Sequence, residues 1–209
     1  MTTLDQFLPD LCDSVGGGEL QILRLSETPA LVAVFTDKVG SSSTHYVDLP
    51  NLRSELRCNA DLESRCLLCD LKYRLTKRAI LPVYDVATAE VKVLLVSDTR
   101  DPHSLGPQLK AELRQGNLDK KYLALSRKSN RFTVKSLPAK PGHDMGETAI
   151  ADFLAKLKAG QVSLEGVLPV YANAELWDVP ELERSAEALG LVRSDYVRQA
   201  GQVVETVTR

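Results

Sequence analysis

The sequence lacks the marks of several protein classes. No uninterrupted apolar run approaches the ~20 residues of a membrane-spanning helix, and the first 14 residues hold three aspartates but no lysine or arginine, which excludes a secretory signal. Paired-carboxylate, nucleophile-elbow and phosphate-loop patterns are also missing, since Gly16 to Gly18 lack the Lys-Ser/Thr of a Walker loop. We therefore expect a soluble, intracellular, cytoplasmic protein that is not an enzyme and does not bind a membrane.

Aromatic residues are scarce and charge is unevenly spread. Phe, Trp and Tyr make up 5% of the chain, whereas 44% is hydrophobic and 26% charged, a balance typical of one globular domain or two small ones. The net charge of -2 argues against a polyanion partner, but it divides into about -5 for residues 1–69, +8 for residues 70–140 and -5 for residues 141–209. A basic middle between acidic ends predicts an anion-binding surface, with a merely solvated polar face as the alternative.

Hydrophobic periodicity predicts a mainly β protein. We expect an N-terminal helix within residues 1–17, a core at 18–140 with an irregular insert at 41–70, and a helical C-terminal region at 141–209. Within the core, strands are expected at 20–25 and 31–35 as a hairpin, then at 79–86, 91–97, 121–126 and 132–136, with a helix at 105–113 and no convincing strand in the insert. Six short strands and one helix favour an OB-type small barrel.

Three of the four cysteines lie in the insert. Cys66 and Cys69 form a C-x-x-C motif, Cys58 lies eight positions earlier, and His45 lies thirteen before Cys58. Three thiolates and an imidazole are the ligand set that favours tetrahedral zinc, and ligation would stabilise a segment with few large apolar residues. The spacing therefore predicts a structural zinc site at His45, Cys58, Cys66 and Cys69.

Other interpretations of these residues stay open. The motif could be a redox pair or a disulfide, although a reducing compartment and the absence of a βαβ context disfavour both, and the thiols could be unrelated and free. His103 or His143 could replace His45 as the fourth ligand. Cys12 is expected to be a core residue, because free cysteine buries readily.

Basic and aromatic residues alternate after the insert. A groove for single-stranded nucleic acid needs cations along the phosphates and rings that stack on bases, and the opposite interpretation is that the rings alternate into the core. We predict phosphate contacts at Lys72, Arg74, Lys77, Arg78, Lys92, Lys120, Lys121, Arg127, Lys128 and Arg131. We predict base contacts at Tyr73, Tyr84, Tyr122 and Phe132.

The order His-x12-Cys-x7-Cys-x2-Cys, followed by a basic stretch and strands, resembles the zinc-containing OB-fold single-stranded-DNA-binding proteins of tailed bacteriophages, the T-even helix-destabilising type. The resemblance covers roughly residues 18–170, loosely except at the ligands. It implies that the four ligands hold a structural zinc, that the residues after them face a DNA cleft, and that a phage-encoded protein would act in the host cytoplasm. Unlike that family, the first 20 residues carry four acids and no base.

These features lead to one preferred function and two alternatives. The preferred one is a sequence-independent binder that coats and protects unpaired DNA during replication, recombination or repair, with replication or recombination proteins as partners of the C-terminal helices. The first alternative is a zinc-stapled OB-fold protein-interaction subunit of a larger nucleoprotein assembly. A sequence-specific zinc-finger regulator is disfavoured, because no recognition helix follows the C-x-x-C motif at finger spacing.

Overall fold

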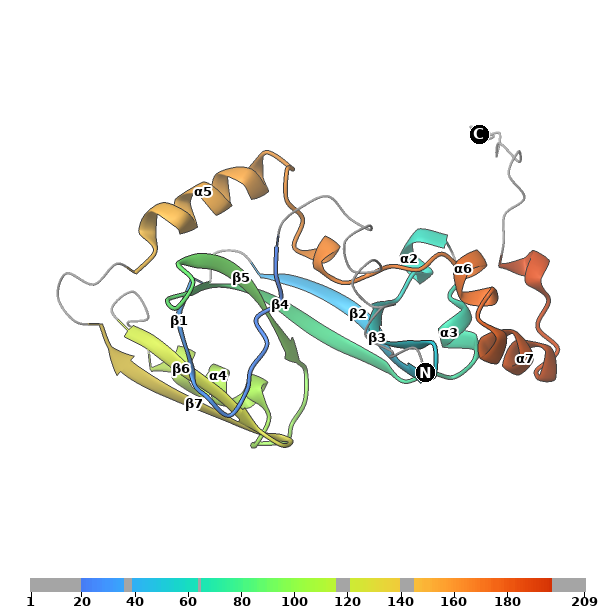
Figure 1. Cartoon of the computed structure of the whole chain (residues 1–209), viewed down its shortest axis with the longest axis horizontal. Helices are drawn as coiled ribbons and strands as arrows, with labels where there is room; N and C mark the ends of the chain where they lie inside the picture. Colours follow the sequence, from blue (N-terminus) through green and yellow to red (C-terminus); the bar gives the residue numbers. More distant parts are fainter. Residues whose placement is uncertain (1–19, 36–38, 64, 116–120, 140–144, 197–209) are drawn as a thin grey trace, which may run out of the picture. The chain divides into compact units, whose positions relative to one another are not determined.

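The computed structural model describes residues 20–35, 39–63, 65–115, 121–139 and 145–196 (Figure 1). The helix expected within residues 1–17 lies outside them. The chain forms two compact units. One, the sheet unit, comprises Met1–Ser42 and Thr76–Leu168, and the other, the cysteine unit, comprises Ser43–Leu75 and Pro169–Arg209. Each unit combines two separate stretches of sequence, which differs from the expected division into consecutive segments.

The protein is mainly β, as predicted. Seven strands form an antiparallel sheet in the order β3-β2-β4-β1-β6-β7, with β5 paired to β4. Their bounds are β1 Ala30–Val34, β2 Gly40–Leu49, β3 Leu52–Arg57, β4 Leu75–Asp85, β5 Glu90–Ser97, β6 Lys121–Lys128 and β7 Arg131–Pro138. Among the described residues no pairing joins β5 to β7, so the sheet is not closed and the expected OB-type barrel is not confirmed.

The sheet unit confirms most of the strands expected in it. β4, β5, β6 and β7 match the predicted strands, and helix α4, Leu105–Arg114, matches the predicted helix. The segment 20–25 does not form the expected hairpin with β1. Instead Ile22 makes an isolated parallel bridge to Val93 of β5: the backbone N–H of Leu23 donates to the carbonyl of Val93, and the N–H of Val93 donates to the carbonyl of Gln21.

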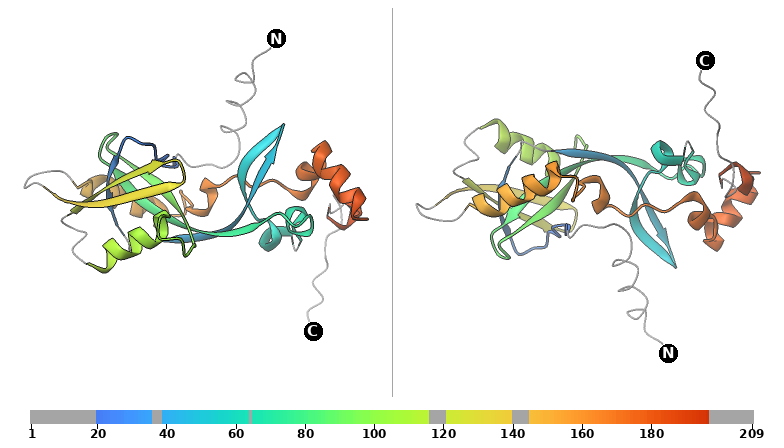
Figure 2. Two further views of the ribbon diagram at one scale, coloured as in Figure 1. Left: turned by 90° about the horizontal axis from the view of Figure 1, so that it is seen from below. Right: turned by 90° about the horizontal axis from the view of Figure 1, so that it is seen from above.

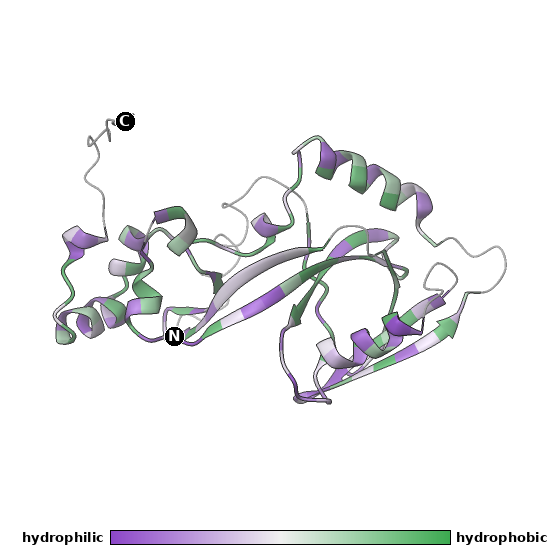
Figure 3. Cartoon of the chain, turned by 180° about the vertical axis from the view of Figure 1, so that it is seen from behind, coloured by the Kyte–Doolittle hydropathy of each residue, from purple (hydrophilic) through white to green (hydrophobic). Residues whose placement is uncertain are grey.

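Helices cover both faces of the strands in the sheet unit (Figure 2). Leu105 and Leu109 of α4 pack among Val32, Val83 and Leu123. Helix α5, Glu147–Lys158, covers the opposite face of β4 and β5, where its Phe153 joins a core of Ile80, Val93, Leu164 and Leu168. Hydrophilic and hydrophobic residues alternate over residues 131–135 of β7 in the same unit (Figure 3), as expected of a strand with one buried face.

The cysteine unit overturns the prediction that the insert has no convincing strand. β2 and β3 form a hairpin around Pro50 and Asn51, in which His45 and Val47 are buried while Tyr46 is exposed. The serine-rich start of β2 is typical of a loop, but β2 lies between β3 and β4 in the sheet, and a strand that is buried on one face needs only alternate apolar residues. Helices α2, Ala60–Glu63, and α3, Leu67–Asp70, follow.

The C-terminal helices belong to two different units. α5 lies in the sheet unit, whereas α6, Asn173–Trp177, and α7, Pro180–Ala188, pack on the insert. Their Leu176, Trp177 and Leu182 share a core with Leu56 and Leu67. Short 3-10 turns lie at Glu165–Val167 and Arg193–Asp195. No helix in the described ranges is both long and apolar enough to span a bilayer.

Candidate functional site

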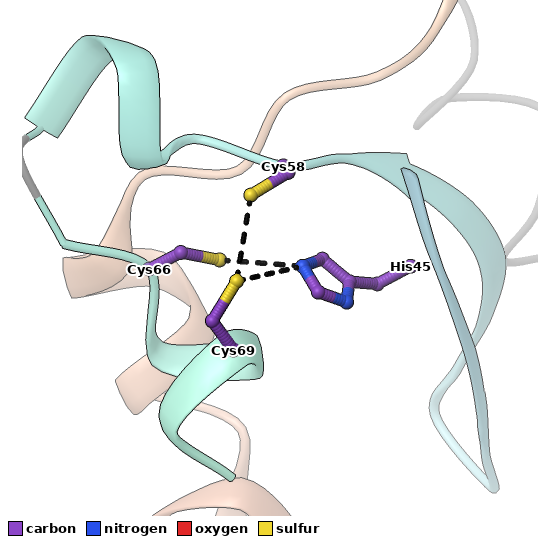
Figure 4. A group of neighbouring side chains, drawn as sticks. All are labelled: His45, Cys58, Cys66 and Cys69. Atoms are coloured by element: carbon purple, nitrogen blue, oxygen red, sulfur yellow. Dashed lines mark hydrogen bonds between the residues drawn. The ribbon is translucent and has the colours of Figure 1, made fainter. Parts of the chain in front are cut away.

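The four predicted metal ligands lie together in the cysteine unit (Figure 4). His45 lies in β2, and Cys58 directly follows β3. Cys66 directly precedes α3, and Cys69 lies within it. Nε2 of His45 lies 3.7 Å from Sγ of Cys66 and 3.3 Å from Sγ of Cys69. Sγ of Cys58 lies 3.6 Å from Sγ of Cys69, and all the ligand atoms lie within 4.8 Å of one another. The three thiols are free.

These distances fit a tetrahedral metal ion. Bonds of ~2.3 Å to sulfur and ~2.0 Å to nitrogen in a tetrahedron require about 3.8 Å between two sulfurs and about 3.5 Å between sulfur and nitrogen. The sulfur–sulfur and sulfur–nitrogen separations given above lie within a few tenths of an ångström of those values. The cluster therefore can hold a metal ion. The structure brings His45 to the cysteines and not His103, which lies in the sheet unit; His143 and Cys12 lie outside the described residues.

Burial makes one thiol of the cluster, that of Cys69, hard to ionise. His45, Cys58 and Cys66 are buried, and Cys69 is half-buried. Burial, together with hydrogen bonding to Cys58 and the nearness of Cys66, raises the pKa of Cys69 to about 12. A bound cation reverses this preference, because it stabilises the thiolate directly.

A network of buried amides holds the Cys66–Cys69 turn in place. Oδ1 of Asn173 accepts a hydrogen bond of 2.9 Å from the backbone N–H of Leu67, and Nδ2 of Asn173 donates to the backbone oxygen of Arg65 at 3.0 Å. Asn59 donates to Asn173 and to the backbone oxygen of Tyr171. Asn173 is fully buried, so the first residue of α6 fixes the turn that carries two of the ligands.

A second clamp ties the turn to Tyr196. The hydroxyl of Tyr196 donates to Asp70 at 2.6 Å, and Arg65 donates to both Asp70 and Tyr196 at 2.9 Å. The Tyr196 hydrogen bond, followed by that of Arg65, lowers the pKa of Asp70 despite its partial burial. Sequence reasoning missed Asn59, Asn173 and Tyr196, because no local pattern connects residues more than 100 positions apart.

The predicted nucleic-acid contacts fall into three groups. Six side chains are exposed: Lys72, Arg74, Lys77, Arg127, Lys128 and Arg131. Five are half-buried: Tyr73, Arg78, Lys92, Lys121 and Phe132. Tyr84 and Tyr122 are buried, and Lys120 lies outside the described residues. The exposed cations at positions 72 and 74 belong to the cysteine unit and the others to the sheet unit.

Three of these residues are corrections to the predicted interface. Tyr84 and Tyr122 are 4% and 3% exposed and pack with Ala33 under Ile150 of α5, so neither ring offers a face to a base. A Cβ on Gly146 would lie 2.3 Å from the Tyr84 ring, which shows how closely the chain covers it. Lys92 donates to Asp85 at 2.7 Å and is only 13% exposed, so its charge is neutralised within the protein.

Among the predicted nucleic-acid contacts, the exposed cations are most closely spaced in the β6–β7 hairpin. Residues 121–138 include five lysines and arginines and no aspartate or glutamate. Arg127, Lys128, Arg131 and Lys135 are all exposed. Lys128 and Arg131 face each other across the two-residue turn, and the guanidinium of Arg127 lies 5.4 Å from the centroid of the Phe132 ring. The hairpin therefore presents cations beside one partly accessible ring.

Comparisons of the chain with protein-family models, with curated proteins and with solved structures find no match.

Proposed function

We propose that the protein is a non-enzymatic binder of single-stranded DNA that coats and protects unpaired strands largely without regard to sequence. The observation that carries the proposal is the acid-free β6–β7 hairpin with its exposed Arg127, Lys128, Arg131 and Lys135. Clustered cations neutralise phosphates whatever the base sequence. Binding only the unpaired form would shift a duplex toward melting by mass action.

The proposal includes an OB-type fold for the sheet unit. In the sheet, the strands of this unit lie in the order β7-β6-β1-β4-β5. Along the chain, helix α4 lies between β5 and β6, the third and fourth of these strands in sequence. An OB fold is a five-stranded, partly open barrel. α4 contacts β5 and β7, and Gln108 hydrogen-bonds the backbone of Phe132 and Val134 on β7. Helix α4 thus occupies the place where the two edge strands would otherwise close.

The proposal also includes zinc as the metal. Three sulfurs and one imidazole nitrogen are the donors that zinc prefers, and four protein ligands leave no open position for a catalytic water. The role is therefore structural: the ion would fix β2, β3 and α3 around one point. His45, Cys58, Cys66 and Cys69 would hold it.

The proposed path of the DNA depends on which face of the sheet unit α5 covers. OB folds commonly bind oligonucleotides on the face of their second and third strands, which here correspond to β4 and β5. The outward-facing Ile80 and Val93 of these strands are buried beneath Phe153 of α5. We therefore assign the phosphate contacts to the hairpin rather than to that face.

The test is a fluorescence-polarisation titration of the full chain with labelled oligo-dT over a range of salt concentrations. The double variant Lys128→Gln/Arg131→Gln should weaken binding about tenfold at low salt and flatten the slope of log K against log salt by about 1.4, since each single-strand phosphate contact contributes ~0.7. The matched control is Lys156→Gln/Lys158→Gln, two exposed lysines of α5, and it should leave both quantities unchanged. Equal losses in the two variants would contradict the assignment.

The coverage of β4 and β5 by α5 favours a second candidate, a protein-interaction subunit of a nucleoprotein assembly whose nucleic-acid face is closed. Under that function the wild-type chain would not bind oligo-dT at any salt concentration in the same titration.

A further inference from the structure

We infer that Tyr46 is a base-stacking site on the cysteine unit; this inference rests on the proposed function. Single-stranded nucleic-acid sites combine cations with accessible aromatic rings, and the sequence prediction looked for those rings at Tyr73, Tyr84, Tyr122 and Phe132. Two of them are buried and two are half-buried. Tyr46 is 55% exposed and is the one exposed aromatic side chain within the part of the chain that the structure describes.

Its exposure follows from the register of the β2–β3 hairpin. His45 and Val47 on either side point into the metal cluster and the core of the unit. Alternation along the strand therefore turns Tyr46 to the opposite, outer face. Neither Tyr46 nor its cross-strand partner Glu55 belongs to the apolar core. The apolar core of the unit therefore does not explain a large aromatic side chain at this position.

A hydrogen bond to its hydroxyl restrains the Tyr46 ring. Nε of Arg53 donates a 3.3 Å hydrogen bond to the hydroxyl of Tyr46, and the same Nε lies 3.1 Å from Oδ1 of Asp48. A ring fixed by its hydroxyl loses little side-chain entropy when a base stacks on it. A metal ion bound by the neighbouring His45 would also fix the strand that carries the ring.

The surroundings make this contact independent of salt. Arg53 is paired with Asp48, and Thr44 donates to Glu55. On the face of the hairpin that carries Tyr46, the charges of Asp48 and Glu55 therefore balance those of Arg53 and Arg57. Tyr46 would contribute stacking and almost no phosphate neutralisation. This separates it from the β6–β7 hairpin, whose contribution changes with salt.

The experiment compares wild type, Tyr46→Leu and Tyr46→Phe against two labelled probes, oligo-dT and an abasic oligomer of the same length and charge. Stacking on one ring implies that Tyr46→Leu weakens oligo-dT binding ~5- to 150-fold. The slope of log K against log salt and the binding of the abasic probe should stay at wild-type values. Tyr46→Phe keeps the ring and should stay within about threefold of wild type on both probes. Metal content and circular dichroism establish that the variants are folded.

Each outcome has a distinct meaning. Unchanged binding of Tyr46→Leu to oligo-dT overturns the inference and leaves the proposed function standing. Equal weakening on both probes also overturns it, because the ring would then act through the fold of the unit. If wild type binds neither probe, the proposed function fails and the inference fails with it.

Discussion

At the scale of residues, the ion pair between Lys92 and Asp85 in the sheet unit is strongly buried. Nζ of Lys92 lies 2.7 Å from Oδ2 of Asp85, and their side chains are 13% and 6% exposed. Burial alone would raise the pKa of Asp85, but hydrogen bonds from Lys92, from the backbone of Ala87 and from Thr88 bring it below its ordinary value. The carboxylate therefore stabilises the fold only while it is charged.

The resulting pH dependence can be measured. A lowered pKa in the folded state gives stability that is present above the unfolded pKa of ~3.9 and is lost as pH falls through the folded value. Asp85→Asn should lower the free energy of unfolding by about 3 kcal/mol at pH 7, because it leaves Lys92 buried and unpaired. The difference from wild type should shrink below about pH 4. Urea unfolding between pH 7 and pH 3 tests this.

The double variant Asp85→Asn/Lys92→Met serves as the control for this pair. It removes both charges, so its stability at pH 7 should lie closer to wild type than that of Asp85→Asn. A penalty for Asp85→Asn that is the same at pH 7 and pH 3 would contradict a role for the carboxylate charge.

At the scale of elements, the start of α6 holds the turn before α3 through a single side chain. Asn173 both accepts from Leu67 and donates to Arg65 in a fully buried position. Asn173→Ala leaves a buried N–H and a buried carbonyl without this partner, which should cost about 1–3 kcal/mol of unfolding free energy. Because the turn carries Cys66 and Cys69, metal should also pass faster to a chromogenic chelator.

Asn51→Ala is the matched control for Asn173→Ala. Asn51 is exposed in the β2–β3 turn of the same unit, so its variant should change stability and metal release little. Metal release from Asn173→Ala at the wild-type rate would show that the amide does not position the ligands.

Some elements of the structure can be predicted from local sequence patterns, and others cannot. The strands β4 to β7 and helix α4 could be predicted because their periodicity and turn residues are local. The same holds for the four ligands, whose residue types and spacing carry the chemistry. The β2–β3 hairpin was missed because its polar first half becomes a strand only when paired. For Tyr84 and Tyr122 the sequence left base contact and burial in the core as alternatives, because alternation does not reveal that α5 covers their face.

At the scale of the whole molecule, the two units have separate cores and different sources of stability. Within the described residues, the sheet unit has three apolar clusters of its own. The cysteine unit has one, built of short helices and a hairpin around the candidate metal site. A small segment that ligates a metal ion gains part of its folding free energy from that ligation. The sequence placed the ligands in such a segment, but it did not reveal that residues 169–196 complete the unit.

Metal removal should therefore unfold one unit and spare the other. Ligation is worth ~10–16 kcal/mol in structural zinc sites, more than a small unit retains without it. After treatment with a strong chelator, backbone amides of β3, α3 and α7 should lose protection from hydrogen exchange, whereas those of β1 and β6 should keep it. Cys69→Ser should reproduce the pattern without chelator, and added Zn²⁺ should restore the wild-type chain alone. Loss of protection throughout both units would instead mean that the metal stabilises the molecule as a single cooperative structure.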